Sequence, residues 1–220
     1  LNAGPDQLNQ LENDLENAQL NWLKSAKKLT AKRTKAAKKL VSHVSTTLSR
    51  LAMERCDFQV VLTQRPEGTP DPVGAEQVEF LISTNPGSAA GSLAKIASGG
   101  ELSRISLALQ VAAAESATAP TMIFDEVDVG IGGGVAEVVG ELLKQLSQRV
   151  QVLCVTHLAQ VACKGSNHLQ VSKSGDDSAV FTEVNLLETE ARVEEIARMQ
   201  GGLTITDSTR ALAREMLSAQ

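Results

Sequence analysis

The first fifty residues carry a repeating pattern of hydrophobic positions that is typical of a coiled coil. Mostly apolar side chains recur at alternating spacings of three and four, and neither Gly nor Pro interrupts residues 7–54. The repeat comprises Leu8, Leu11, Leu15, Ala18, Trp22, Ser25 and Leu29 and, after a slip of phase between 29 and 37, Ala37, Leu40, Val44, Thr47 and Leu51. This spacing predicts one long helix that packs against a second helix. Because the chain holds no second heptad segment, we expect the partner to be another copy or a helix outside this sequence.

The remaining sequence alternates strand patterns with helix patterns. Two runs in which apolar and polar residues alternate, around 58–62 and 78–82, predict an antiparallel strand pair joined by a long loop. Further along, we expect a helix from Ser98 to about Ala112, strands at 122–124 and 150–156, a helix over 135–146, strands near 168–173 and 179–187, and helices beginning near Thr189 and Asp207. This alternation is typical of an α/β fold, with a mostly parallel sheet flanked by helices. We therefore divide the chain into a coiled-coil arm, 1–55, and an α/β lobe, 56–220.

Charge is distributed unevenly between these two regions. The net charge is −5, but residues 1–55 hold ten Lys and Arg against five Asp and Glu, whereas residues 56–220 hold eleven against twenty-one. A run without any acidic residue lies within the predicted helix and comprises Lys24, Lys27, Lys28, Lys32, Arg33, Lys35, Lys38 and Lys39. Such a run is either a solvated face of the coiled coil or a contact to the phosphate backbone of DNA. For the second interpretation the candidates are Lys32, Arg33, Lys35 and Lys38.

Composition narrows the class of protein. No apolar run approaches the roughly 20 residues that span a bilayer, and the amino end lacks the pattern of a signal peptide. The three cysteines, at unpatterned positions, favour free thiols over a disulfide framework. We expect a cytoplasmic protein without a membrane partner, and since the sequence begins with Leu1 we expect it to be part of a longer chain.

The first chemical motif is Ser98-Gly99-Gly100-Glu101. Ser98 and Glu101 have the spacing of a capping box, so Ser98 is expected to open the following helix. The two glycines leave the start of that helix uncovered, and its free N–H groups and positive dipole end can bind an anion such as a phosphate. The alternative for this segment alone is an ordinary capped helix.

The second motif is an apolar strand that ends in Asp125 and Glu126. Open α/β sheets bind their ligands at the carboxyl ends of strands. Two carboxylates there can divide the work, one serving Mg²⁺ or its bound water and the other polarising a nucleophilic water. Asp128 and a glycine-rich turn follow.

The third motif is His157, at the end of a second apolar strand. A histidine so placed can hydrogen-bond a terminal phosphate, although a lone histidine at a strand end also serves purely structural roles. A zinc site from Cys154, His157, Cys163 and His168 is an alternative that these side chains suggest. It is set aside because an interval of three along a strand points Cys154 and His157 to opposite faces.

Taken in this order, the three motifs resemble those of the nucleotide-binding heads of SMC-like ATPases, which belong to the ATP-binding-cassette class. The resemblance rests on Ala97–Arg104, Ile123–Ile131 and Cys154–Leu158, and on the long helix that runs directly into the lobe. It implies that Ser98, Gly99, Gly100 and Glu101 form the signature that contacts ATP bound to the opposite head. It further implies that Asp125 is the Walker B aspartate serving Mg²⁺, Glu126 the general base, Asp128 the D-loop aspartate and His157 the switch histidine.

The same resemblance implies a function. The branch of the family that it favours repairs DNA double-strand breaks in bacteria, so we expect an ATPase associated with the nucleoid whose heads dimerise on ATP and separate after hydrolysis. The implied partners are a second head, DNA and possible recombination proteins. No G-x-x-x-x-G-K-[ST] phosphate loop occurs in the sequence, so the amino-terminal half of the head is expected to supply it and this chain to be inactive alone. The alternative is a non-catalytic coiled-coil module that binds partners or tethers DNA.

Overall fold

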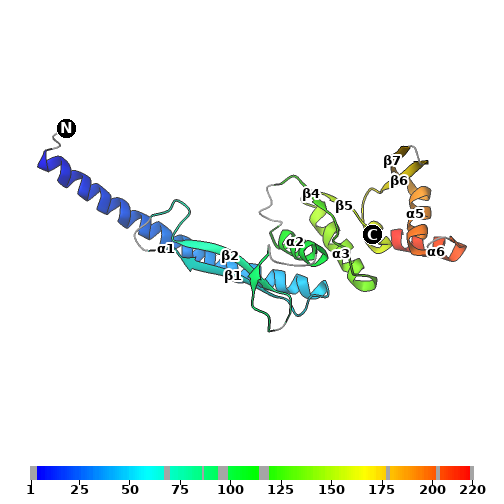
Figure 1. Ribbon diagram of the computed structural model, residues 1–220, viewed down its shortest axis with the longest axis horizontal. Helices are drawn as coiled ribbons and strands as arrows, with labels where there is room; N and C mark the ends of the chain where they lie inside the picture. Colours follow the sequence, from blue (N-terminus) through cyan, green and yellow to red (C-terminus); the bar gives the residue numbers. More distant parts are fainter. Residues whose placement is uncertain are drawn as a thin grey trace. The chain divides into compact units, whose positions relative to one another are not determined.

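The chain forms two compact units in the computed structural model, which describes residues 4–66, 70–85, 87–93, 99–113, 119–176, 179–201 and 204–218. The first unit combines residues 1–45 with 55–95, and the second combines 46–54 with 96–220. Figure 1 shows the elements of both. This division differs from the expected boundary at residue 55, because the strand pair groups with the long helix and not with the lobe.

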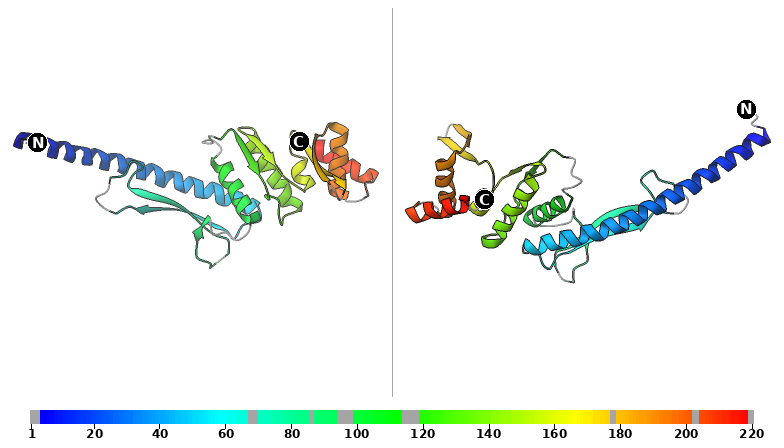
Figure 2. Two further views of the ribbon diagram at one scale, coloured as in Figure 1. Left: turned by 45° about the horizontal axis from the view of Figure 1, so that its top comes forward. Right: turned by 180° about the vertical axis from the view of Figure 1, so that it is seen from behind.

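In the first unit the long helix is accompanied by a β-hairpin. The helix is α1 (Pro5–Arg50), and the strands are β1 (Asp57–Gln64), β2 (Glu76–Ser83) and the short β3 (Gly91–Ser92). β1 and β2 pair antiparallel, with Phe58 opposite Ile82 and Val60 opposite Phe80, which confirms the predicted strand pair. The two strands lie along α1 in every view (Figures 1 and 2).

A buried ion pair joins the hairpin to α1. The side chain of Glu76 is fully buried and lies 3.2 Å from Arg33 Nη1. Thr30 donates its hydroxyl hydrogen to the same carboxylate, and Arg33 Nη2 donates to the carbonyl of Val73 at 2.7 Å. These interactions, the Thr30 hydrogen bond foremost and the Arg33 guanidinium next, hold the pKa of Glu76 below its ordinary value. Because a buried carboxylate needs partners, this pair fixes the position of the first residue of β2 against Thr30 and Arg33 of α1.

The hairpin also covers part of the predicted coiled-coil seam. Trp22 Nε1 donates to the carbonyl of Asp71 at 3.1 Å, and a β-carbon built on Gly74 would lie 2.8 Å from Leu29 Cδ2. Gly74 has φ +105°, a conformation that favours glycine. At Trp22 and Leu29 the seam therefore packs on the same chain, which the heptad pattern did not predict. Closer to the amino end, Leu8, Leu11 and Leu15 stay exposed.

The second unit contains the remaining helices and strands. In chain order they are α2 (Gly99–Ala113), β4 (Thr121–Phe124), α3 (Gly133–Ser147), β5 (Gln151–Cys154), α4 (Ala159–Ala162), β6 (Leu169–Asp176), β7 (Ala179–Leu186), α5 (Thr189–Gly201) and α6 (Asp207–Ser218). β4 and β5 pair in parallel and β6 and β7 antiparallel. The predicted α/β class is confirmed, as are the starts of α5 and α6.

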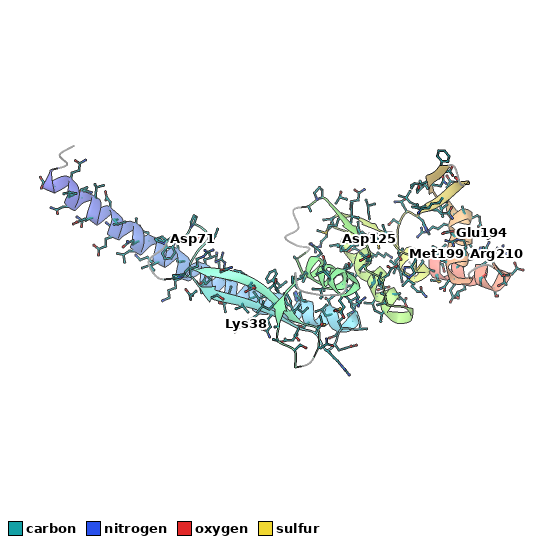
Figure 3. All side chains as sticks on the ribbon, in the orientation of Figure 1. Lys38, Asp71, Asp125, Glu194, Met199 and Arg210 are labelled. Carbon is teal, nitrogen blue, oxygen red and sulfur yellow. The ribbon has the colours of Figure 1, made fainter. Side chains whose placement is uncertain are left out.

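Small and aliphatic side chains bring α4, α5 and α6 together. Their buried cluster comprises Ala159, Cys163, Val193, Ile196, Ala197 and Ala213. Arg192 adds hydrogen bonds from its guanidinium to carbonyls that follow α4, including that of Cys163 at 3.0 Å. On the surface, Arg210 of α6 pairs with Glu194 of α5 at 2.7 Å (Figure 3). These contacts hold the segment after His157 against the C-terminal helices.

Two sheet faces of this unit are apolar and open. In the β6–β7 pair, Leu169 lies opposite Leu186 and Val171 opposite Val184, and all four are more than half exposed. The other face of the pair is turned toward α5, since Gln170 donates to Glu195 at 2.7 Å. In the β4–β5 pair, Ile123, Leu153 and the adjoining Val155 are exposed. Among the described residues, no helix combines the length and the apolarity required to cross a membrane.

Candidate functional site

The parallel register of β4 and β5 brings the second and third motifs to one edge of the sheet. Phe124 is the register partner of Cys154, and the N–H of Val155 donates to the carbonyl of Phe124 at 2.9 Å. Asp125 and Glu126 therefore leave β4 at the level where Val155 to His157 leave β5. Because parallel strands end at a common edge, this is the position at which α/β sheets bind ligands.

Glu126 adopts an unusual backbone conformation at this edge. Its φ is +58°, in the left-handed region, which costs a non-glycine residue about 1–2 kcal/mol. Asp125 Oδ1 stabilises the turn by accepting from the N–H of Glu126 at 2.9 Å. Backbone strain of this kind clusters at functional sites. The strained backbone makes the Glu126 carboxylate a candidate for chemistry, as the sequence indicated.

The amino end of α2 lies directly against this turn. A β-carbon on Gly99 would lie 2.6 Å from Glu126 Oε2, and one on Gly100 would lie 3.0 Å from the carbonyl oxygen of Val129. A side chain at Gly100 would thus press on the backbone of the second motif, whereas one at Gly99 would meet only the movable end of the Glu126 side chain. The helix begins at Gly99 and includes Glu101 in its first turn, whereas Ser98 lies outside the described residues. Its capping-box contact stays a prediction.

Two residues that the sequence reasoning missed fasten α2 to the turn. Ser103 donates its hydroxyl hydrogen to the carbonyl of Asp125 at 3.0 Å. The next residue along α2 is Arg104, whose Nη1 donates to the carbonyl of Val129 at 2.9 Å. The two side chains therefore hold both ends of the 125–129 turn. In the sequence both residues lie within the matched segment Ala97–Arg104, but neither was given a role of its own.

Asp128 is turned toward the third motif. The residue is buried, with 2% of its surface exposed. Its Oδ2 accepts from the hydroxyl of Thr156 at 2.5 Å and from the N–H of His157 at 3.1 Å, and it lies 3.3 Å from His157 Nδ1. The aspartate and the histidine, which the sequence assigned to separate motifs, thus form one cluster.

The carboxylates at this edge fit a magnesium ion better than a soft metal. Asp125 and Glu126 are exposed and offer the hard oxygen ligands that Mg²⁺ prefers. Figure 3 marks Asp125 beside α2 and β4, where a depression of about 240 Å³ is lined by Ser103, Ser106, Gln110, Met122, Ile123, Phe124 and Asp125. Burial raises the pKa of Cys154 to about 12, with help from the charges of Asp128 and Asp125. This thiol is a poor zinc ligand at neutral pH, because metals bind the thiolate.

The basic residues of α1 separate into two groups. Lys32, Lys35 and Lys38 are exposed, whereas Arg33 is engaged with Glu76 and Val73 of the hairpin. At 3.6 residues per turn, Lys24, Lys28, Lys32, Lys35 and Lys39 fall within an arc of about 80° that faces away from Arg33. Arg33, one of the four DNA-binding candidates, thus has an intramolecular role that the sequence did not reveal.

Comparison with known proteins identifies relatives over nearly the whole chain. No family model matches. The DNA repair protein RecN of Xylella fastidiosa (strain Temecula1) is 47% identical over 210 residues, which is 96% of this chain and 38% of that protein. The DNA repair protein RecN of Vibrio cholerae is 42% identical over 219 residues, 100% of this chain and 39% of that protein. The chain therefore spans less than two fifths of the length of these relatives.

Solved structures give the same fold. The Smc head domain with a coiled coil and joint from Pyrococcus yayanosii superimposes with a TM-score of 0.59 at 21% identity, over 87% of this chain and 34% of that one. The Smc head domain with an extended coiled coil from Pyrococcus furiosus gives a TM-score of 0.55 at 20% identity, over 88% and 46%. At this level of identity the similarity establishes the α/β fold of an SMC-type head.

Proposed function

The chain is a relative of RecN that corresponds to the C-terminal part of that protein, and on this premise we propose that it is one half of an SMC-like ATPase head acting in repair of DNA double-strand breaks. The observation that carries the proposal is the meeting of three motifs. The start of α2, the Asp125–Glu126 turn and His157 converge at one edge of the β4–β5 sheet. A strained glutamate, a helix start with two glycines and a histidine at one strand edge together favour a nucleotide site over three separate structural roles.

We assign the residues roles in ATP hydrolysis. Asp125 holds Mg²⁺ through water, and the ion, when bound with ATP, neutralises charge on the phosphates. Glu126 accepts a proton from the attacking water, as a general base. His157 orients the terminal phosphate or that water. The signature of Ser98, Gly99, Gly100 and Glu101 offers helix N–H groups to ATP on a second, identical head, so the active form is a homodimer of heads.

The open apolar faces favour a further partner, the amino-terminal half of the same head. Ile123, Leu153 and Val155 on one face and the four aliphatic residues of β6 and β7 on another are exposed, although such side chains are normally buried. The chain spans 38% of its Xylella relative, which leaves ample sequence to cover both faces. That half would also provide the phosphate loop. The proposed location is the cytoplasm, at the nucleoid.

The test is ATP turnover by this chain alone and after mixing with a separately produced amino-terminal half. We expect no turnover alone and turnover on mixing. Glu126→Gln should abolish turnover in the mixture but keep ATP binding and head dimerisation, whereas Glu137→Gln, an exposed carboxylate on α3, should change nothing. If the two variants turn over alike, Glu126 is not the base. If the mixture binds DNA or a protein partner but never hydrolyses ATP, the chain belongs to a non-catalytic coiled-coil module.

The arc of α1 that carries Lys24, Lys28, Lys32, Lys35 and Lys39, here called the lysine face, favours DNA as a second ligand. The hairpin occupies the side of α1 that carries Arg33, so the opposite side remains free for the sugar–phosphate backbone. Each lysine that contacts a phosphate should contribute about 0.9 to the slope of log affinity against log salt. Neutralising Lys32, Lys35 and Lys39, which lie within the same arc, should therefore lower the slope by up to about three. An unchanged slope would make this a solvated face.

A further inference from the structure

The buried carboxylate of Asp128 has a limited set of partners. Among the residues that the structure describes, the polar groups recorded against this carboxylate are three atoms of Thr156 and His157, and all three approach the same oxygen, Oδ2. Within the described residues, no Lys or Arg forms an ion pair with Asp128. A carboxylate that is 2% exposed depends on such donors for its stability. The backbone N–H of His157 is therefore bonded to this carboxylate, and its imidazole lies beside it.

The proximity of the Asp128 carboxylate favours a proton on one ring nitrogen of His157 over the other. A neutral imidazole has one nitrogen that donates and one that accepts. Nδ1 lies 3.3 Å from Oδ2, and because an ionised carboxylate carries no hydrogen, its negative charge favours a proton on Nδ1 over one on Nε2. The other nitrogen, Nε2, is then left without hydrogen, on a side chain that is 69% exposed. The surroundings of one ring nitrogen influence in this way whether the other carries a proton.

Thr156 strengthens the arrangement. Its hydroxyl donates to Asp128 and accepts from the N–H of Leu158 at 3.0 Å, at the start of α4. The backbone on both sides of His157 is consequently fixed relative to Asp128. A shift of the 125–129 turn, which Ser103 and Arg104 fasten to α2, would carry the imidazole with it.

We propose that Asp128 is a positioning residue that sets the tautomer and the orientation of His157, and so links the signature helix to the imidazole through the 125–129 turn. In the neutral ring, Nε2 accepts a hydrogen bond from a bound water; in the protonated ring it donates one to a phosphate oxygen. The assignment of water and phosphate rests on the proposed function, whereas the tautomer does not. Asp128 thereby acts on ATP through His157 and not by direct contact.

The tautomer can be measured by long-range ¹H–¹⁵N NMR on the 220-residue chain with ¹⁵N-labelled histidine, at a pH where the ring is neutral. The sequence has three histidines, and loss of one set of signals in His157→Gln assigns the ring. We expect the Nδ1–H form in the wild type and a shift toward the Nε2–H form in Asp128→Ala. Thr156→Val, which keeps the carboxylate, should keep the Nδ1–H form.

An Nε2–H ring in the wild type, or the same tautomer in Asp128→Ala, would overturn the proposal. If Asp128→Ala fails to fold, the tautomer of His157 in the wild-type spectrum alone tests the proposal. In the mixture with the amino-terminal half, Asp128→Ala and His157→Ala should each reduce turnover, and the double variant should be no worse than the more severe single variant. Additive losses would mean that Asp128 acts separately from His157. A mixture without turnover defeats the proposed function but leaves the NMR result standing.

Discussion

Replacing Arg33 by Met should destabilise the first unit, although this residue lies in a run of lysines. The substitution keeps the apolar stem and removes the partner of a carboxylate whose side chain is fully buried. Glu76 must then remain charged without Arg33 or take up a proton. At pH 7 protonation of a carboxyl with the ordinary pKa of 4.5 costs about 3.4 kcal/mol, at 1.36 kcal/mol per pH unit. Breaking a buried ion pair typically costs about 3–5 kcal/mol, but protonation of Glu76 limits this cost. We therefore expect the free energy of unfolding to fall by about 3 kcal/mol.

The single tryptophan gives the assay. Trp22 donates to the carbonyl of Asp71 in the hairpin loop, so its fluorescence during urea unfolding reports whether the hairpin is attached to α1. Lys35→Met is the matched control. Lys35 is exposed, and substitutions at such positions change stability by less than about 0.5 kcal/mol. Arg33→Met combined with Glu76→Gln should recover part of the loss, since no charge is then left buried.

The effect should also depend on pH in one direction. The pKa of Glu76 is lowered in the folded chain, so its ionised form contributes stability above pH 4.5 that is lost as the pH falls through the folded pKa. The gap between the wild type and Arg33→Met should therefore narrow on acidification. An Arg33→Met variant as stable as Lys35→Met at pH 7, or a gap that does not narrow, would refute the reasoning.

Two further predictions concern packing and thiol chemistry. Gly140→Ala should lower the melting temperature by circular dichroism, since its β-carbon would lie 3.0 Å from the backbone oxygen of Gln160. Gly134→Ala, with open space around it, should raise it, because alanine favours a helix by about 1 kcal/mol; equal melting temperatures would contradict this account. At pH 8, iodoacetamide should modify Cys154 more slowly than Cys56, since a pKa of about 12 leaves little thiolate. Peptide mass spectrometry would measure both rates, and equal rates would show that Cys154 is not protected.

Local periodicity was sufficient to predict most of the elements. The alternation around Phe58 and Phe80 predicted the β1–β2 pair, and Thr189 and Asp207 marked the starts of α5 and α6. The edge shared by Asp125 and His157 also followed from the sequence, because two apolar strands of parallel type each ended in a polar motif. These features depend on neighbours in the chain or on a general rule of sheet topology.

Contacts between distant residues could not be predicted in this way. Glu76 and Arg33 are 43 positions apart, and nothing in the lysine run distinguishes Arg33 from its neighbours. Ser103 reaches a carbonyl 22 positions away. Such a bond to the main chain leaves no complementary side chain that a reader of the sequence could pair with it. The contact of Asp128 with His157 was equally hidden, since the family resemblance assigned each residue its own role.

The hairpin has a mechanical consequence for α1. The part of α1 that packs against the strands should bend less than a helix without such contacts. Among the described residues, the hydrogen bonds between α1 and the hairpin begin at Trp22, while Leu8, Leu11 and Leu15, nearer the amino end, are exposed. Any sideways load on the amino end of α1 would concentrate its curvature where the support begins. The place at which α1 would bend is thus set by the hydrogen bond from Trp22 to the hairpin loop and by the turn around Gly74.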